Sequence, residues 1–326
     1  MRLAAALGLI CAALFALSLV IGQAEVPAGQ SLRALVLDDG TPLSVVMREI
    51  RLPRTLLGAM IGASLGLCGA ALQGYLRNPL AEPGLIGVSG AAALGAVLAI
   101  HSGLALRFAL ALPLAGLGMA LVAVLLILAL AGPRGGPMTL ILAGIAISAL
   151  ASALTALVLN LSPNPFAAAD IVFWMMGSLA DRAFGHVWLA APFMLAGWAL
   201  LAGLGRGLDA LTLGEDAAQS MGVHLPRLRL RLVIGTALAV GAATAVAGAI
   251  GFVGLVVPHL LRPLVGARPS ALMWSSALGG AAMVLAADIA VRAALPDRDL
   301  KLGVLMALVG APLFLHLIYK TRKEMP

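Results

Sequence analysis

Small residues recur at every fourth position of one apolar stretch, and this spacing constrains the fold more than any other feature. Within RLPRTLLGAMIGASLGLCGAALQGYLRNPLAEPGLIGVSG, residues 51–90, the series is Gly58, Gly62, Gly66, Ala70 and Gly74. A helix with this spacing has one face bare of side chains, which lets a neighbouring backbone approach closely in lipid. In a soluble helix each glycine would cost roughly 1 kcal/mol relative to alanine. The stretch therefore predicts a membrane-spanning helix, then a turn rich in Pro and Gly, then a second helix.

Composition extends this prediction to the whole chain. Of its 326 residues 62% are hydrophobic and 11% are charged, and the mean hydropathy is +1.06. Soluble domains carry about 25% charged residues. Spans of about 20 apolar residues fit at ten places, namely 3–22, 55–76, 85–101, 105–131, 138–161, 187–206, 229–250, 251–261, 270–292 and 302–319. We therefore predict an all-α, polytopic membrane protein with about ten transmembrane helices.

The eighth stretch, 251–261, is too short to cross a bilayer alone and has the sequence GFVGLVVPHLL. Irregular backbone at membrane depth survives only inside protein or beside a cavity. We expect this segment in the interior of the bundle.

Charge indicates the orientation of the chain. An even number of spans puts both termini on one side, and the basic tail KTRKEMP indicates that this side is cytoplasmic. Twelve of the 21 Lys and Arg residues then face the cytoplasm and nine face outward, a modest bias in the direction of the positive-inside rule. The basic residues are scattered between spans without aromatic platforms, which argues against nucleic acid. The first 22 residues mimic a signal peptide, but we expect them to remain as an uncleaved first helix.

Three longer polar stretches connect the spans of what we predict to be one domain, residues 1–326. Residues 23–50 should form an outer loop with an amphipathic segment at the interface. Residues 162–186 should hold a short outer helix containing Met175 and Met176, before a Gly-Ser break. The third stretch, about 207–228, is the largest predicted cytoplasmic loop.

The cytoplasmic loop contains LTLGEDAAQSMGVHLPRLR, residues 211–229. Gly214 breaks the preceding structure, Glu215 and Asp216 suit a helix start, and Gly222 ends that helix after about two turns. Two short helices are expected to flank Pro226. Spacing alone leaves two interpretations open, an ordinary capped connection and an element that docks into another subunit.

Arginines stand at the predicted outer ends of two spans, where the positive-inside rule does not place them. Arg51 and Arg54 share a face at the start of the second span. Arg292 ends the ninth span, with Asp288 one turn earlier as a candidate partner. From the sequence alone, these arginines either snorkel to lipid head groups or form a positive rim that receives an acidic protein.

Residue clusters that could carry out chemistry are lacking in the sequence. There is no G-x-x-x-x-G-K-[ST] phosphate loop. The histidines lack the spacing of a metal site; they are His101, His186, His224, His259 and His316. We therefore predict no catalytic residue, no metal site and no cofactor bound by this chain.

Several motifs resemble the permease family of bacterial ABC transporters that import iron–siderophores, haem and cobalamin. They are the block 51–90, LGEDAAQSMGV (213–223), GFVGLVVPHLLRPLVG (251–266), LAADIAVR (285–292) and LGVLMALVGAPLFLHLI (302–318). The resemblance implies the permease fold of a type II ABC importer in the bacterial inner membrane. It also implies four partners or kinds of partner: a second copy of the chain, two ABC ATPase subunits that use ATP and Mg²⁺, a periplasmic substrate-binding protein and membrane lipid.

The same resemblance implies which residues contact the ATPase. This coupling element would consist of Gly214, Glu215, Asp216, Gln219, Ser220, Met221 and Gly222. Arg51, Arg54 and Arg292 would dock the binding protein.

A cytoplasmic gate is also implied. One half would be Asn78 and Leu80 in the turn RNPLAEPG, which on its own reads as an ordinary turn. The other half would be Pro137 and Met138. Met175 and Met176 are candidate contacts along the pathway, with core packing as the alternative.

An ion-coupled secondary transporter is the alternative function. Such a protein needs ionisable groups within the membrane, and Asp288 is the only candidate in the sequence. We expect import of a bulky metal complex, an iron–siderophore or haem first and cobalamin as the further candidate.

Overall fold

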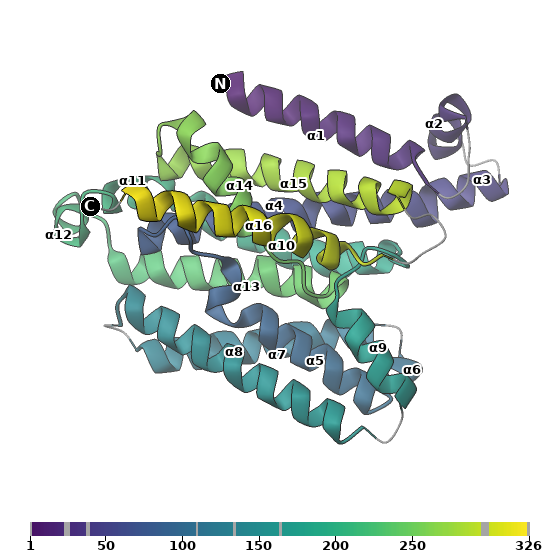
Figure 1. Cartoon of the computed structure of the whole chain (residues 1–326), viewed down its shortest axis with the longest axis horizontal. Coiled ribbons are helices and arrows are strands. Elements are labelled where there is room, and N and C mark those ends of the chain that lie inside the picture. The colour runs from purple at the N-terminus through teal and green to yellow at the C-terminus, as the bar shows by residue number, and fades with distance from the viewer. Residues whose placement is uncertain are drawn as a thin grey trace.

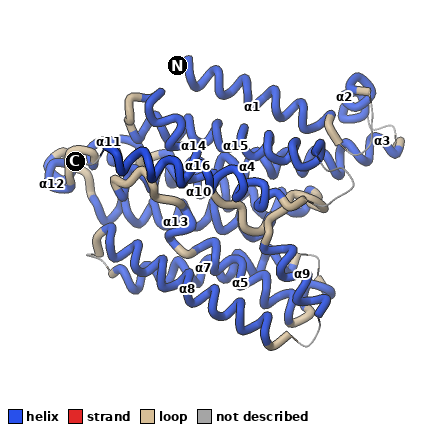
Figure 2. The backbone as a smooth tube through the Cα atoms, viewed as in Figure 1, coloured by secondary structure: helices blue, strands red, loops and turns tan. Residues whose placement is uncertain are grey.

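The computed structural model describes residues 2–22, 27–36, 40–108, 110–132, 135–162, 165–294 and 300–324. Within these ranges every regular element is a helix and no strand is present (Figure 2). Most of the long helices run roughly side by side along one axis (Figure 1). The predicted all-α class is confirmed.

Each of the ten predicted spans corresponds to a helix. Their bounds are α1 (Arg2–Val20), α4 (Leu52–Leu76), α5 (Val88–His101), α7 (Ala111–Ala131), α8 (Pro137–Asn160), α10 (Phe184–Ala202), α13 (Leu225–Ala247), α14 (Val253–Leu261), α15 (Pro269–Ala294) and α16 (Leu302–Glu324). In the described ranges, seven helices are long and apolar enough to cross a membrane by length and composition. The other three of the ten, α5, α14 and α16, contain shorter apolar runs.

Shorter helices lie in the connections. They are α2 (Ala28–Val36), α3 (Pro42–Val45), η1 (Val46–Arg51), η2 (Pro83–Ile86), α6 (Leu104–Arg107), α9 (Pro165–Met175), α11 (Gly205–Leu211), α12 (Glu215–Ser220) and η3 (Arg262–Val265). Of these, α9 is the short helix that the sequence predicts before the Gly-Ser break.

The second span starts earlier than predicted. The short α3 and the π-helical η1 run without a break into α4 and form one helix of 35 residues, Pro42–Leu76. Thr41 caps its start, where Thr41 Oγ1 accepts a hydrogen bond from the Ser44 N–H at 3.3 Å. Pro53 would crowd the preceding turn of an ordinary α-helix, and the wider π turn just before it relieves that crowding. Residues 42–50 of the predicted outer loop therefore belong to this helix.

The helix α15 packs along the bare face of α4, as expected from the small-residue spacing. A Cβ atom on Gly62 would overlap the carbonyl group of Gly280, and one on Gly66 would overlap the carbonyl group of Ser276. Ala70, one turn further along, is fully buried. The two backbones approach so closely that only glycine fits at the crossing, which maximises contact where lipid offers no hydrophobic drive for association.

The spanning helices differ in how much of their length is buried inside the protein. In the spans Pro42–Leu76 and Leu225–Ala247, 78% of the most apolar 18-residue stretch is buried, against 11% in Arg2–Val20. The helix α1 therefore lies on the outside of the bundle, against α4 and α15 (Figure 1).

The short α14 lies in the interior, as predicted. Its nine residues extend about 14 Å, under half of a hydrocarbon core of about 30 Å. A Cβ atom on Gly69 of α4 would overlap the carbonyl group of Gly254, and residues 253–258 are all buried. Phe252, just before α14, adopts a left-handed conformation with φ of 67°.

The bundle has two distinct ends. One carries α11 and α12 and is called the α12 end; the other carries α2, α3, α6 and α9 and is called the α9 end (Figure 1). The first helix begins and the last helix ends toward the α12 end.

Candidate coupling and gate site

The predicted coupling element forms α12 and the turns on either side of it. Gly214 precedes α12 with φ of 106°, a conformation that favours glycine, and Glu215 and Asp216 occupy the first turn. Gly222 follows with φ of 85°, and its N–H donates to the Gln219 carbonyl at 2.9 Å. Both predicted boundaries of this helix are confirmed.

The prediction that short helices flank Pro226 is wrong. The helices α11 and α12 both precede it, and Pro226 lies in the first turn of α13. Proline is favoured there because the first N–H groups of a helix have no acceptor within the helix. His224 caps the same helix, because its Nδ1 accepts a hydrogen bond from the Arg227 N–H at 3.3 Å.

The tip of the coupling element presents both apolar and polar side chains. Leu213 and Met221 are 69% and 64% exposed, and the polar side chains of Asp216, Gln219 and Ser220 are exposed between them. Single exposed apolar residues are ordinary, but here two of them bracket one short helix. Leu213 is a candidate contact that the sequence analysis missed, because it follows an apolar run and reads as its end.

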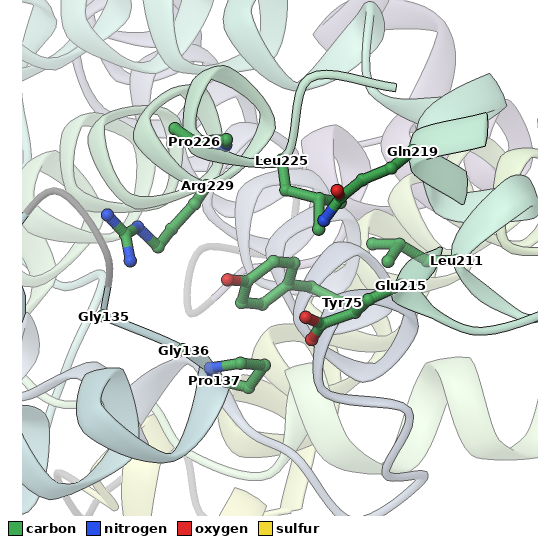
Figure 3. Close-up of a pocket in the computed structure, with 10 residues that line it drawn as sticks. All are labelled: Tyr75, Gly135, Gly136, Pro137, Leu211, Glu215, Gln219, Leu225, Pro226 and Arg229. Carbon is green, nitrogen blue, oxygen red and sulfur yellow. The ribbon is translucent and has the colours of Figure 1, made fainter. Parts of the chain in front are cut away.

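A pocket of about 280 Å³ lies beside α12 (Figure 3). Its walls come from the last turn of α4, the turn before α8, α11, α12 and the start of α13. Tyr75 projects into the middle of the pocket from α4, with Glu215 and Pro137 beside it (Figure 3). Glu215 and Gln219 of the coupling element thus share one pocket with Pro137 of the predicted gate.

Arg229 links the same elements from the other side. It is 9% exposed, and its Nη2 donates to the Gly132 carbonyl at 2.7 Å. Gly132 follows the last residue of α7, where free carbonyls carry partial negative charge and favour a cation. The start of α13 is thereby tied to the connection between α7 and α8. Nothing in the sequence distinguishes Arg229 from the other basic residues of the predicted cytoplasmic side.

The other predicted gate residues lie outside this pocket. Asn78 Oδ1 accepts a hydrogen bond from the Leu80 N–H at 2.9 Å, which closes the turn after α4. Asn78 is exposed and Leu80 is half-buried. Met138, in the first turn of α8, is 67% exposed. Only Pro137 of the four predicted gate residues lines the pocket.

A polar cluster that the sequence analysis missed ties the turn 77–87 to α14. Gln73 Nε2 donates to backbone carbonyls of that turn and of α14 at 3.3 Å, and Gln73 Oε1 accepts from Arg262 Nη2 at 2.6 Å. Glu82 Oε1 accepts from the Phe252 N–H at 2.7 Å. Burial raises the pKa of Glu82 above its usual range, and the hydrogen bond from Phe252 opposes this rise. Asp288 is therefore not the only acidic residue inside the bundle.

At the α9 end, two arginines converge on one buried carboxylate. Arg54 Nε and Nη2 lie 3.0 and 2.8 Å from Asp288 Oδ1. Arg292 Nη2 lies 3.0 Å from Asp288 Oδ2, so the predicted pair one turn apart is confirmed. Asp288 is 1% exposed.

Arg51 and Arg292 also donate hydrogen bonds to backbone carbonyl groups at the end of α1. Arg51 Nη1 donates to the Leu19 and Val20 carbonyls at 3.0 and 2.7 Å. Arg292 Nη1 donates to the Ser18 carbonyl at 3.0 Å, and its Nη2 donates to Ser18 Oγ at 2.7 Å. The last carbonyls of a helix lack donors within the helix and favour cations.

Two of the three arginines of the predicted outer rim are largely buried, and their docking of a binding protein stays a prediction. Arg51 is 5% exposed and the Arg292 side chain is 8% exposed, whereas the Arg54 side chain retains 19%. These residues gather at the α9 end as predicted, but their contacts hold α1, α4 and α15 together.

Replacing Asp288 with asparagine should strongly destabilise the protein. Removing one partner of a buried ion pair costs about 3–5 kcal/mol, because the other charges remain buried without compensation. Thermal unfolding of the purified protein measures this, with Asp181→Asn as the control because Asp181 is exposed. Equal stability of the Asp288→Asn variant and the parent would show that the cluster does not hold α1.

The candidate pathway residues lie near the α9 end. Met175 ends α9 and is half-buried, and Met176 is 37% exposed. The start of α16 packs against this turn, because a Cβ atom on Gly303 would overlap the Met176 carbonyl group. Their contact with a transported molecule stays a prediction. Within the described residues, no group of three His, Cys, Asp or Glu side chains could hold a metal ion.

Comparison with known proteins gives a consistent family. The model of the FecCD transport family matches residues 10–320. Among curated relatives, the cobalamin import system permease protein BtuC of Halobacterium salinarum is 38% identical, over 93% of this chain and 82% of the relative. The hemin transport system permease protein HmuU of Yersinia pestis is 37% identical, over 85% of this chain and 84% of the relative.

One solved structure resembles nearly the whole chain. It is described as an inward-facing conformation of an ABC transporter assigned to the metal-chelate type, and it superposes with a TM-score of 0.85 at 33% identity. The similarity covers 98% of this chain and 99% of that one.

Proposed function

The chain belongs to the FecCD transport family and is a multi-span ABC transporter permease; on that premise we propose that it carries a bulky metal complex across the bacterial inner membrane in an ATP-driven importer. ATP and Mg²⁺ would be used by two separate ATPase subunits. Two copies of the chain would form the pathway, and a periplasmic binding protein would deliver the cargo.

The main support for this proposal is the pocket beside α12. It joins Glu215 and Gln219 of the coupling element to Pro137 at the start of α8 and to Tyr75 at the end of α4. A push on α12 from an ATPase would therefore act directly on two spanning helices. The bond from Arg229 to Gly132 transmits the same push to the connection between α7 and α8.

The cargo is proposed from the relatives. The relatives named above transport cobalamin and hemin. We expect an iron–siderophore or haem first and cobalamin as the further candidate.

Ion-coupled secondary transport is less consistent with the buried acids. Coupling requires a carboxylate that can take up and release an ion. Asp288 is held by two arginines, and Glu82 accepts a hydrogen bond from the backbone at the start of α14. Each carboxylate is already engaged by the protein itself.

Co-purification tests the proposed assembly. The tagged full-length permease, extracted in mild detergent, should retain an ATPase subunit in equal numbers, and the preparation should hydrolyse ATP. A permease that transports its cargo while retaining no ATPase would overturn the proposal.

Docking of the binding protein at the α9 end should depend on Arg54, which keeps the largest open surface of the three arginines. An exposed charge pair contributes about 1 kcal/mol, so Arg54→Gln should weaken binding several-fold at low salt. The effect should fade at 1 M salt, where the Debye length is about 3 Å. Affinity of the binding protein for the reconstituted permease at two salt concentrations measures this.

Arg107→Gln is the control, because it removes an exposed arginine at the same end and should bind like the parent. Thermal unfolding checks that the Arg54→Gln variant is folded. If the folded Arg54→Gln variant binds the binding protein as tightly as the parent does, docking does not use Arg54.

Both termini are proposed to be cytoplasmic, together with the α12 end. A cysteine introduced at position 324 should resist a membrane-impermeant thiol reagent in intact spheroplasts, whereas Ser102→Cys should react, because Ser102 is exposed between α5 and α6. If the cysteine at position 324 is labelled and Ser102→Cys is not, the chain has the opposite orientation in the membrane.

A further inference from the structure

A second cavity, of about 560 Å³, lies at the α12 end beside the end of α4. Its walls come from the end of α4, α11 and the turn between α14 and α15. Cavities that hold small ligands measure about 300–1,000 Å³. No residue of this cavity lines the pocket beside α12.

Three arginines line this cavity, from three different parts of the chain. Arg77 directly follows α4, Arg262 starts η3, and Arg268 precedes α15. The single acidic lining residue is Asp209. The cavity wall therefore carries a formal surplus of two positive charges.

Asp209 is already occupied as a cap of α15. Its Oδ1 accepts from the Ser270 N–H at 2.9 Å, and its Oδ2 accepts from Ser270 Oγ at 2.6 Å. The contact of Arg268 Nη2 with Asp209 is long, at 3.4 Å, and the Arg268 side chain is 72% exposed. Such an exposed pair leaves the guanidinium available for another anion.

The other two arginines have unused donors. Among the described residues, the Arg77 side chain makes no hydrogen bond or ion pair, and Arg262 Nε is buried without an acceptor. Arg262 is oriented by its bond to Gln73 Oε1 at 2.6 Å. Planar guanidinium groups with several free N–H donors suit phosphate oxygens.

We propose that this cavity binds a phosphate group, and that its occupant is the head group of an anionic phospholipid in the cytoplasmic leaflet. The cavity lies where α4 ends and α15 begins, which is the level of the head groups for two spanning helices in the proposed orientation. Basic pockets between transmembrane helices on this side of a membrane bind anionic head groups. The site goes beyond the proposed transport function and requires no ATP, ATPase or binding protein.

Lipid retention by the full-length permease tests the site. The protein would be incubated in detergent with phosphatidylglycerol or with phosphatidylcholine, and bound lipid counted by native mass spectrometry. Arg77→Gln with Arg268→Gln should lower phosphatidylglycerol retention by at least about tenfold, because charge-assisted hydrogen bonds are lost. The matched control is Arg227→Gln with Arg231→Gln, which removes two exposed arginines at the same end outside the cavity.

Three outcomes of this experiment would contradict the proposal or change the identity of the bound molecule. Binding of inorganic phosphate at millimolar concentration by a parent protein that retains no phosphatidylglycerol would overturn the lipid assignment in favour of a soluble phosphate. Equal retention by the parent and the cavity variant would overturn the site itself. Retention that disappears when the ATPase subunit binds would also overturn the proposal, because a protein surface then occupies the cavity in the working complex.

Discussion

Replacing Gly66 with alanine should abolish the folded permease. The new Cβ would overlap the Ser276 carbonyl group on α15, and backbone on both sides leaves no flexible side chain to move. Overpacking a tight interior costs about 1–3 kcal/mol or more, and a clash between two backbones should exceed that range. Gly62→Ala, against Gly280, should behave in the same way. Size-exclusion chromatography of the detergent-extracted protein measures the folded fraction, which should fall by about 100-fold.

Gly118→Ala is the matched control, since Gly118 lies within α7 and a Cβ there would meet open space. That variant should be as stable as the parent. A normal yield of Gly66→Ala would show that α4 and α15 are not in close backbone contact at Gly66.

Reversing the charge of the coupling element, by Glu215→Lys with Asp216→Lys, should abolish transport while the protein still folds. Each acid at a helix start contributes only about 0.3–1 kcal/mol to the helix. At an interface, however, reversed charges cost several kcal/mol, and a lysine at 215 would enter the pocket that Arg229 lines. Transport in reconstituted vesicles should fall by at least about 100-fold, and ATP hydrolysis should no longer respond to cargo.

Two controls accompany this variant. Glu215→Gln with Asp216→Asn keeps the side-chain size and should give an intermediate loss. Asp181→Asn, which changes an exposed acid outside the coupling element, should transport normally. Full transport by the lysine variant would mean that α12 is only a connection.

Sequence periodicity predicted the fold well because the membrane restricts the alternatives. Apolar length located a helix at each of the ten predicted spans, and the glycine spacing predicted that one face of α4 allows a close neighbour, which is α15. The extension of α4 back to Pro42 was not predictable from hydropathy, because residues 42–51 are polar enough to read as a loop. The prediction of one domain over 1–326 stays a prediction.

The site was less predictable, since it depends on which helices become neighbours. Gly214 and Gly222 were identified from local rules of helix capping. The convergence of Tyr75, Pro137 and Glu215 on one pocket joins residues more than 50 positions apart, which no local pattern encodes. The contacts of Arg51 and Arg292 with the end of α1 were not predictable, because a sequence does not reveal that the carbonyls of α1 end beside these arginines.

The central claim is that ATP hydrolysis by a partner drives this permease. The most direct measurement is uptake of labelled ferric siderophore, haem or cobalamin into proteoliposomes that contain the permease, its ATPase and its binding protein. We predict that one of these cargoes accumulates only when ATP and Mg²⁺ are present on the side that carries the α12 end. Uptake that follows an imposed proton or sodium gradient without ATP would contradict the account and favour a secondary transporter.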